Sequence, residues 1–94
     1  MNIQHRSETG HGVFFVEQDG TILAEMVYKS HDPSVMIIEH TEVSDQLKGQ
    51  NVGTQLVQTA VEYARKHHMK ILPICPFAHA VLHKKAEYKD IIAE

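Results

Sequence analysis

The hydrophobic positions of this chain change their period once, near residue 43. Before that point, apolar residues occur in short runs or alternate with polar ones, as Ile22, Ala24, Met26 and Tyr28 do, which is typical of strands. Asp19-Gly20 lies between two such segments and predicts a hairpin turn. We therefore expect antiparallel strands near residues 3–7, 13–16, 22–28 and 34–41.

After Val43 the period is that of a helix. The apolar positions of the longest periodic segment are Val52, Leu56, Val57, Ala60, Val61 and Ala64, and they predict one long helix. Lys70 to Cys75 then predicts a short strand ended by Pro76. A shorter helix is expected over 77–85, packing through Phe77, Val81 and Leu82.

The predicted order is four strands, a helix, a strand and a helix. A strand, helix and strand in succession require a parallel, right-handed crossover, so the sheet should be mixed. The expected fold class is α/β (α+β), with a mostly antiparallel sheet of about five strands, one long helix after the fourth strand and a shorter one after the fifth. We expect residues 1–94 to form a single domain, because 94 residues cannot enclose two cores.

The composition and charge of the chain limit the partners and the cellular compartment that we expect for it. Nine Lys plus Arg against twelve Asp plus Glu give a net charge of -3, so we expect no nucleic-acid partner. A single cysteine cannot form an internal disulfide, which favours the cytoplasm. We also expect no signal peptide and no membrane partner, since no apolar stretch approaches the roughly 20 residues of a membrane span.

The segment from Lys48 to Thr54 precedes the long predicted helix, where backbone amides have no partner within the helix. Gly49 and Gly53 allow close backbone approach, and Asn51 tolerates the left-handed conformation, so the segment could bind a phosphate. Lys48 could add a charge contact. The alternative is that Gly49 and Asn51 only shape a turn while Gly53 serves helix packing.

Glu42 to Val57 resembles the acetyl-CoA signature of Gcn5-related N-acetyltransferases, Gln/Arg-x-x-Gly-x-Gly/Ala. Lys48 occupies the Gln/Arg position, Gly49 and Gln50 are the spacers, Asn51 replaces the middle Gly, and Gly53 matches the last Gly. The chain order from Phe14 to about Tyr88 also resembles the compact, roughly ninety-residue branch of that family. The extra helices and strands by which larger members build their substrate groove are absent here.

This resemblance implies acetyl-CoA as the cofactor. Its pyrophosphate would be held by the amides of Gln50, Asn51, Val52, Gly53 and Thr54, and backbone around Glu42 and Val43 would contact the pantetheine arm and the acetyl carbonyl. The thioester would lie where the fourth and fifth strands diverge, close to Cys75.

Cys75 is accordingly a catalytic candidate. It could accept the acetyl group, line the thioester pocket, or be a buried structural thiol. Direct transfer would instead need a base, for which Glu39 is the first candidate and His40 and Glu42 are competitors. Regular alternation would place Glu39 on one face of its strand and His40 on the other. The tyrosine acid of many relatives has no clear match, since Tyr88 lies rather far along the chain.

Eight histidines are many for this length. His79 and His83 have the spacing that places two imidazoles on one helix face, but no third ligand is evident, so we expect no metal site. The leading hypothesis is an acetyl-CoA-dependent N-acetyltransferase acting on an unknown primary amine. The alternatives are a CoA-binding module with little turnover and an interaction protein that has kept the fold.

Overall fold

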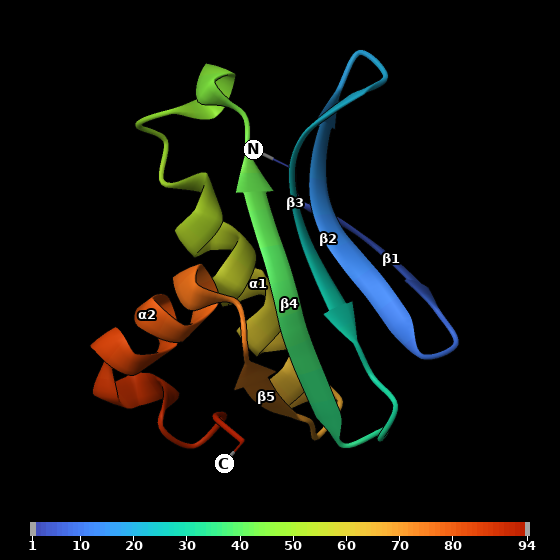
Figure 1. Cartoon of the computed structure of the whole chain (residues 1–94), viewed down its shortest axis with the longest axis vertical. Helices are drawn as coiled ribbons and strands as arrows, with labels where there is room; N and C mark the ends of the chain where they lie inside the picture. Colours follow the sequence, from blue (N-terminus) through green and yellow to red (C-terminus); the bar gives the residue numbers. More distant parts are fainter. Residues whose placement is uncertain (1, 94) are drawn as a thin grey trace.

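The computed structural model describes residues 2–93, which form one five-stranded sheet with two α-helices and two short 3-10 helices (Figure 1). In chain order the elements are β1 (Gln4–Glu8), β2 (His11–Gln18), β3 (Thr21–Lys29), β4 (Val35–Val43), η1 (Asp45–Leu47), α1 (Val52–Lys66), β5 (Lys70–Pro73), α2 (Pro76–Lys84) and η2 (Ala86–Tyr88).

The sheet has the order β1-β2-β3-β4-β5, in which only the β4–β5 pair is parallel. The predicted fold class, a mixed and mostly antiparallel sheet with a long and a short helix, is thus confirmed. Asp19 and Gly20 have φ values of 49° and 81° at the β2–β3 turn. Positive φ at both central residues is what a tight hairpin with right-handed twist requires.

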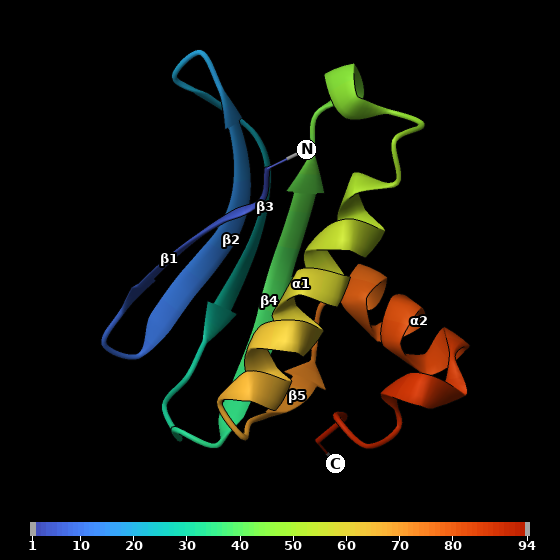
Figure 2. The ribbon, with the colours of Figure 1, turned by 180° about the vertical axis from the view of Figure 1, so that it is seen from behind.

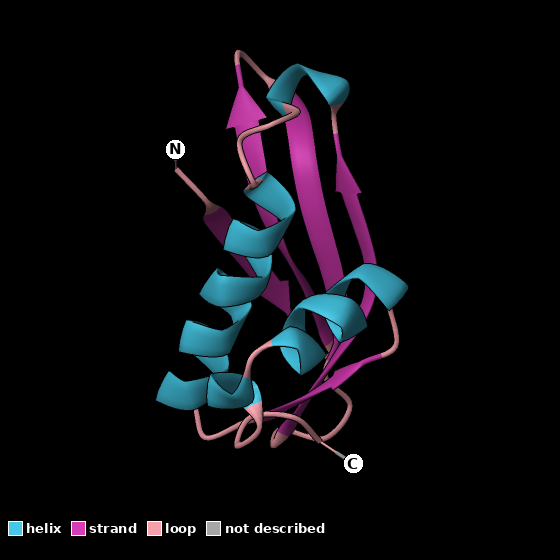
Figure 3. Ribbon diagram, turned by 90° about the vertical axis from the view of Figure 1, so that its left-hand side faces the viewer, coloured by secondary structure: helices cyan, strands magenta, loops and turns pink. Residues whose placement is uncertain are grey.

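The main core lies between the sheet and α1 (Figure 2). All six apolar positions of the predicted long helix are buried there: Val52, Leu56, Val57, Ala60, Val61 and Ala64. Helix α2 packs beside α1 near β5, and the front face of β4 in Figure 1 carries no helix of residues 2–93. Figure 3 shows both helices to one side of the strands. Neither has the length and apolar character needed to cross a membrane.

Two predictions near α2 are wrong. Phe77 was expected to pack into the core, but it is 42% exposed, and Ala78 and Leu82 are the buried residues of this helix. The helix begins at Pro76, so Phe77 lies in its first turn and faces outward over α1. Strand β5 ends at Pro73 and not at Cys75, because the amides of Ile74 and Cys75 both turn to the carbonyl of Ile38.

A β-bulge in β4 corrects the predicted faces of Glu39 and His40. Tyr28 pairs with Ile38 and its neighbour Val27 with His40, so Glu39 is the extra residue of β4. Because a bulge interrupts the alternation of faces, Glu39 and His40 no longer point to opposite sides. Glu39 contacts Lys29 of β3, and His40 lies opposite Val27 on the same face of that strand.

Candidate functional site

The candidate site begins where β4 and β5 part. The parallel ladder runs only from Val35 to Ile38 of β4, and the Ile38 carbonyl accepts hydrogen bonds from the amides of both Ile74 (3.1 Å) and Cys75 (3.0 Å). Beyond this point the chain turns away into α2, while β4 continues to Val43 with β3 on its other side. Among residues 2–93, the second half of β4 therefore has one edge without a strand partner.

The loop between β4 and α1 presents backbone amides at the same end of β4. Gly49 and Asn51 have φ values of 84° and 59°, so both occupy the left-handed region, which the sequence predicted Asn51 to tolerate. The first intrahelical hydrogen bond of α1 runs from Gln55 N to the Asn51 carbonyl (3.1 Å). The amides of Val52, Gly53 and Thr54 precede it and have no partner within the helix.

Local contacts hold this loop in one shape. Ser44 caps η1 by accepting a 3.2 Å hydrogen bond from Gln46 N, and the side chain of Leu47 is buried. The side-chain amide of Gln55 donates through Nε2 to the Gln50 carbonyl at 2.9 Å. The first turn of α1 contains no acidic residue. Its positive dipole end is therefore available to an anion, and the loop needs little ordering to bind one.

Gly53 is closely approached by α2. A Cβ on Gly53 would lie 2.6 Å from Cζ of Phe77, so the helix-packing interpretation of this glycine has a structural basis. The Phe77 ring borders a surface hollow of about 380 Å³, which begins at Thr54 and continues along α2 to His83 and Lys84. A polar loop, an exposed aromatic ring and basic side chains thus follow one another along the surface.

Cys75 lies between the N-terminus of α2 and the unpaired part of β4. It is 5% exposed, and its Sγ is 3.4 Å from Oγ1 of Thr41, to which the thiol can donate. Burial raises the pKa of the Cys75 thiol, but hydrogen bonding to Thr41 and to the amides of Ala78 and Phe77 outweighs it and lowers the pKa below the ordinary value. Such a thiol is more acidic than a cysteine buried among apolar side chains alone.

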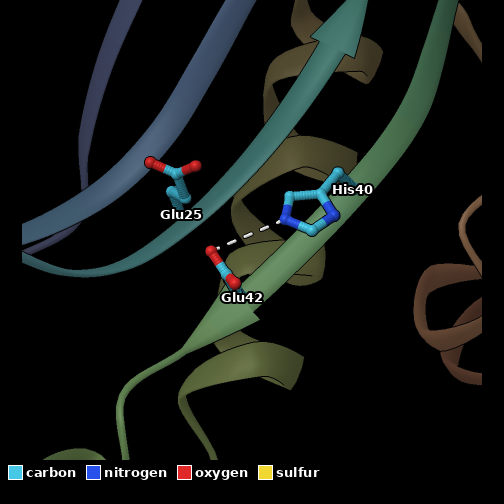
Figure 4. Close-up of side chains that lie close together, drawn as sticks. All are labelled: Glu25, His40 and Glu42. Carbon is cyan, nitrogen blue, oxygen red and sulfur yellow. Dashed lines mark ion pairs between the residues drawn. The ribbon is translucent and has the colours of Figure 1, made fainter.

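Glu39, His40 and Glu42 lie on the other face of β4. Glu39 is 3.3 Å from the Lys29 amine, and His40 Nε2 is 3.6 Å from a Glu42 carboxylate oxygen. Figure 4 shows His40 and Glu42 beside Glu25 of β3. Within residues 2–93, no hydrogen bond or ion pair joins Cys75 to Glu39 or His40. The catalytic candidates therefore form two groups, separated by the backbone of β4.

The remaining predicted positions are placed as follows. Glu42 and Val43 are exposed at the end of β4, and Lys48 and Gln50 are exposed in the loop. The rings of His79 and His83 lie 4.1 Å apart on α2. Sequence reasoning missed Thr41, Glu25 and the contact of Phe77 with Gly53, because each depends on a partner distant in the chain.

The chain thus combines a strand edge that is left unpaired where β4 and β5 part, a loop that presents free backbone amides before α1, and a buried thiol at the start of α2. The sequence profile described as "GCN5-related N-acetyl-transferase" matches residues 13–91. The chain therefore belongs to the GCN5-related N-acetyltransferase family, and the resemblance noted in the sequence is confirmed.

Solved structures agree with this assignment. A GCN5-like protein of Staphylococcus aureus is 35% identical, with a TM-score of 0.76, and the alignment covers 98% of this chain and 87% of that one. Two more distant structures share the fold. Tetrahymena GCN5 is 14% identical with a TM-score of 0.65, and the alignment covers 93% of this chain and 63% of that one. An Elizabethkingia anophelis acetyltransferase with acetyl-CoA bound is 16% identical with a TM-score of 0.61, and the alignment covers 81% of this chain and 52% of that one. The present chain spans only part of the length of these two. No curated protein matches the sequence significantly.

Proposed function

We propose that this protein transfers the acetyl group of acetyl-CoA to a primary amine. The observation that carries the proposal is the combination of free amides at the start of α1 with the unpaired edge of β4, since the first can bind a pyrophosphate and the second can bind an extended pantetheine arm. Membership of the N-acetyltransferase family supports the same reaction class.

The coenzyme would lie across the loop and α2. Its pyrophosphate would accept hydrogen bonds from the amides of residues 50–54, with Lys48 adding positive charge. The hollow beside Phe77 offers an aromatic surface for the adenine, and Lys84 at its far end offers a cation for the 3′-phosphate. The pantetheine arm would then follow β4 past Glu42 and Val43, bringing the thioester close to Cys75.

The acceptor would approach from the face of β4 that carries Glu39. In this mechanism Glu39 removes a proton from the acceptor ammonium, the amine nitrogen attacks the thioester carbonyl, and the carbon–sulfur bond breaks. The Cys75 thiol gives its proton to the departing CoA thiolate, and Thr41 and the α2 amides stabilise the Cys75 thiolate that results. The proton lost by the attacking amine passes into solvent, and the Cys75 thiolate takes up a proton from solvent to regenerate the thiol. His40 is the competing base.

The coenzyme-binding part is tested by calorimetry with acetyl-CoA, acetylated 3′-dephospho-CoA and ATP. We expect saturable binding that prefers acetyl-CoA. Lys48→Gln should weaken the binding of both thioesters alike, because both carry the pyrophosphate. Lys84→Gln should weaken the binding of acetyl-CoA alone, because only acetyl-CoA carries the 3′-phosphate. Absence of binding at millimolar acetyl-CoA would reject the proposal.

The chemical part is tested with a panel of primary amines. Glu39→Gln should lower kcat, and Cys75→Ser should lower it while leaving the affinity for acetyl-CoA unchanged. Intact-protein mass spectrometry after mixing with acetyl-CoA alone should show no acetylated enzyme. An acetyl group found on Cys75 would instead establish a covalent intermediate.

One observation favours a second function, that of a CoA-binding module with little turnover. The face of β4 that carries Glu39 and His40 is not covered by any helix within residues 2–93, so no walled acceptor groove is formed there. Such a module would bind acetyl-CoA in the calorimetric test but acetylate no amine in the panel.

A further inference from the structure

We propose that Glu25, His40 and Glu42 form a binding site for a divalent transition-metal ion, with Zn²⁺ as the preferred ion. The site lies on the face of the sheet opposite α1, at the level where β4 has lost its β5 partner (Figure 4). Nothing in the proposed acetyl transfer requires it, so the two proposals can fail separately.

Strand geometry brings the three side chains together. Glu25 of β3 pairs directly with Glu42 of β4, and His40 precedes Glu42 by two residues, so all three point to one face. Their ligand atoms lie within 4.8 Å of one another, and His40 Nε2 is 3.6 Å from Glu42 Oε2. Zn²⁺ with bonds of about 2.1 Å holds tetrahedral ligand atoms roughly 3.4 Å apart. Small side-chain rotations are therefore enough to enclose the ion.

The ligand types select the class of metal. One imidazole nitrogen with two carboxylate oxygens suits Zn²⁺ and its first-row neighbours, whereas Ca²⁺ and Mg²⁺ prefer oxygen ligands alone. Three protein ligands leave at least one coordination position for water. A surface hollow of about 280 Å³ borders two of the three ligands, Glu25 and Glu42.

The charges of the cluster also call for a cation. Two carboxylates directly opposite each other on neighbouring strands repel. Within residues 2–93 no lysine or arginine forms an ion pair with Glu25 or Glu42, and the nearby Lys29 pairs with Glu39 instead. A divalent ion between the two carboxylates would relieve this repulsion.

The sequence-based expectation of no metal site took His79 and His83 as the candidate pair of ligands. Those two imidazoles lie on one face of α2, but no third His, Cys, Asp or Glu of the described residues completes a group with them. They nevertheless provide an internal competitor, because two histidines can bind a metal ion weakly by themselves.

The test is titration of tag-free, EDTA-dialysed protein with Zn²⁺ by calorimetry and with Co²⁺ by absorption spectroscopy, in the absence of acetyl-CoA. We expect one equivalent of each ion to bind, and we expect Mg²⁺ not to compete. Glu25→Gln, His40→Gln and Glu42→Gln should each weaken binding more than about tenfold. These substitutions keep side-chain size at solvent-accessible positions, and circular dichroism checks that each variant is folded.

Two control variants make the test specific. Glu17→Gln, at an exposed position of β2, and the double variant His79→Gln/His83→Gln should both bind Zn²⁺ like the unsubstituted protein. The proposal is overturned by absence of binding at millimolar Zn²⁺, by full binding in Glu25→Gln, or by loss of binding in the α2 double variant alone. Because the readout is metal binding, an inactive acetyltransferase would not affect the result.

Discussion

Gly12 of β2 is the glycine at which an added Cβ would meet its nearest neighbour at the shortest distance. It is buried and lies directly opposite Tyr28 of β3. A Cβ on Gly12 would lie 2.5 Å from Cζ and 2.8 Å from Cε1 of the Tyr28 ring, and closer still to the hydroxyl. Ordinary contacts between carbon atoms are about 3.5–4.0 Å, so the ring must move by roughly 1 Å.

That movement has a second cost. The Tyr28 hydroxyl lies 2.6 Å from Nε2 of His5, and a shift of this size breaks their hydrogen bond. Tyr28 is only 3% exposed, and its ring packs against His5 and Phe14 at centroid distances of 5.8 and 5.5 Å, so the shift disturbs these contacts as well. Overpacking costs about 1–3 kcal/mol and the lost hydrogen bond about 0.5–1.5 kcal/mol. Alanine loses less conformational entropy on folding than glycine, which offsets about 0.5–1 kcal/mol of this loss. We expect Gly12→Ala to lower the free energy of unfolding by about 2 kcal/mol.

Urea denaturation followed by circular dichroism measures this loss, and thermal unfolding should show a midpoint about 8–16 °C lower. In a Tyr28→Leu background the ring is absent, so the same methyl group should cost less than about 1 kcal/mol. Ser7→Ala, opposite Gly12 on the exposed strand β1, is a control expected within about 0.5 kcal/mol of the unsubstituted protein. A loss below about 0.5 kcal/mol for Gly12→Ala itself would refute the reasoning.

Three further predictions concern titration and backbone conformation. Burial raises the pKa of Tyr28 to about 12 in the folded protein. As the pH rises the unfolded chain therefore loses this proton first, so the free energy of unfolding should fall between pH 10 and 12. Tyr28→Phe should flatten that part of the stability profile, measured by urea denaturation. Thr41→Val removes a hydrogen bond that lowers the pKa of Cys75, so the pH profile of thiol alkylation should move to higher pH, while Thr59→Val should leave it unchanged. Asn51 has a φ of 59°, so Asn51→Val should cost about 1–2 kcal/mol of stability in urea denaturation and Asn51→Gly much less.

The local patterns of the sequence were enough to predict most of the elements. A period of two residues in β3 and a helical period in α1 each reflect one buried face, and that face is a property of consecutive residues. Asp19-Gly20 predicted its turn because few residue pairs tolerate positive φ twice in succession. The amide loop before α1 was predicted for the same reason, since its glycines and Asn51 are local backbone signals.

The face on which Glu39 and His40 lie could not be predicted in this way. Simple alternation separates them, but the register of β4 against β3 inserts Glu39 as an extra residue and brings both to one side. A bulge is a property of two paired strands, and nothing in the β4 segment by itself reports it.

The sequence alone thus determined the order of the elements, the fold class and the loop that presents free amides, because these follow from neighbouring residues. The tertiary structure decided which side chains meet: Thr41 beside Cys75, Phe77 over Gly53, and Glu25 beside His40 and Glu42. Each of these contacts joins two different secondary-structure elements, so it is set by strand register and helix packing, which are long-range properties of the folded chain.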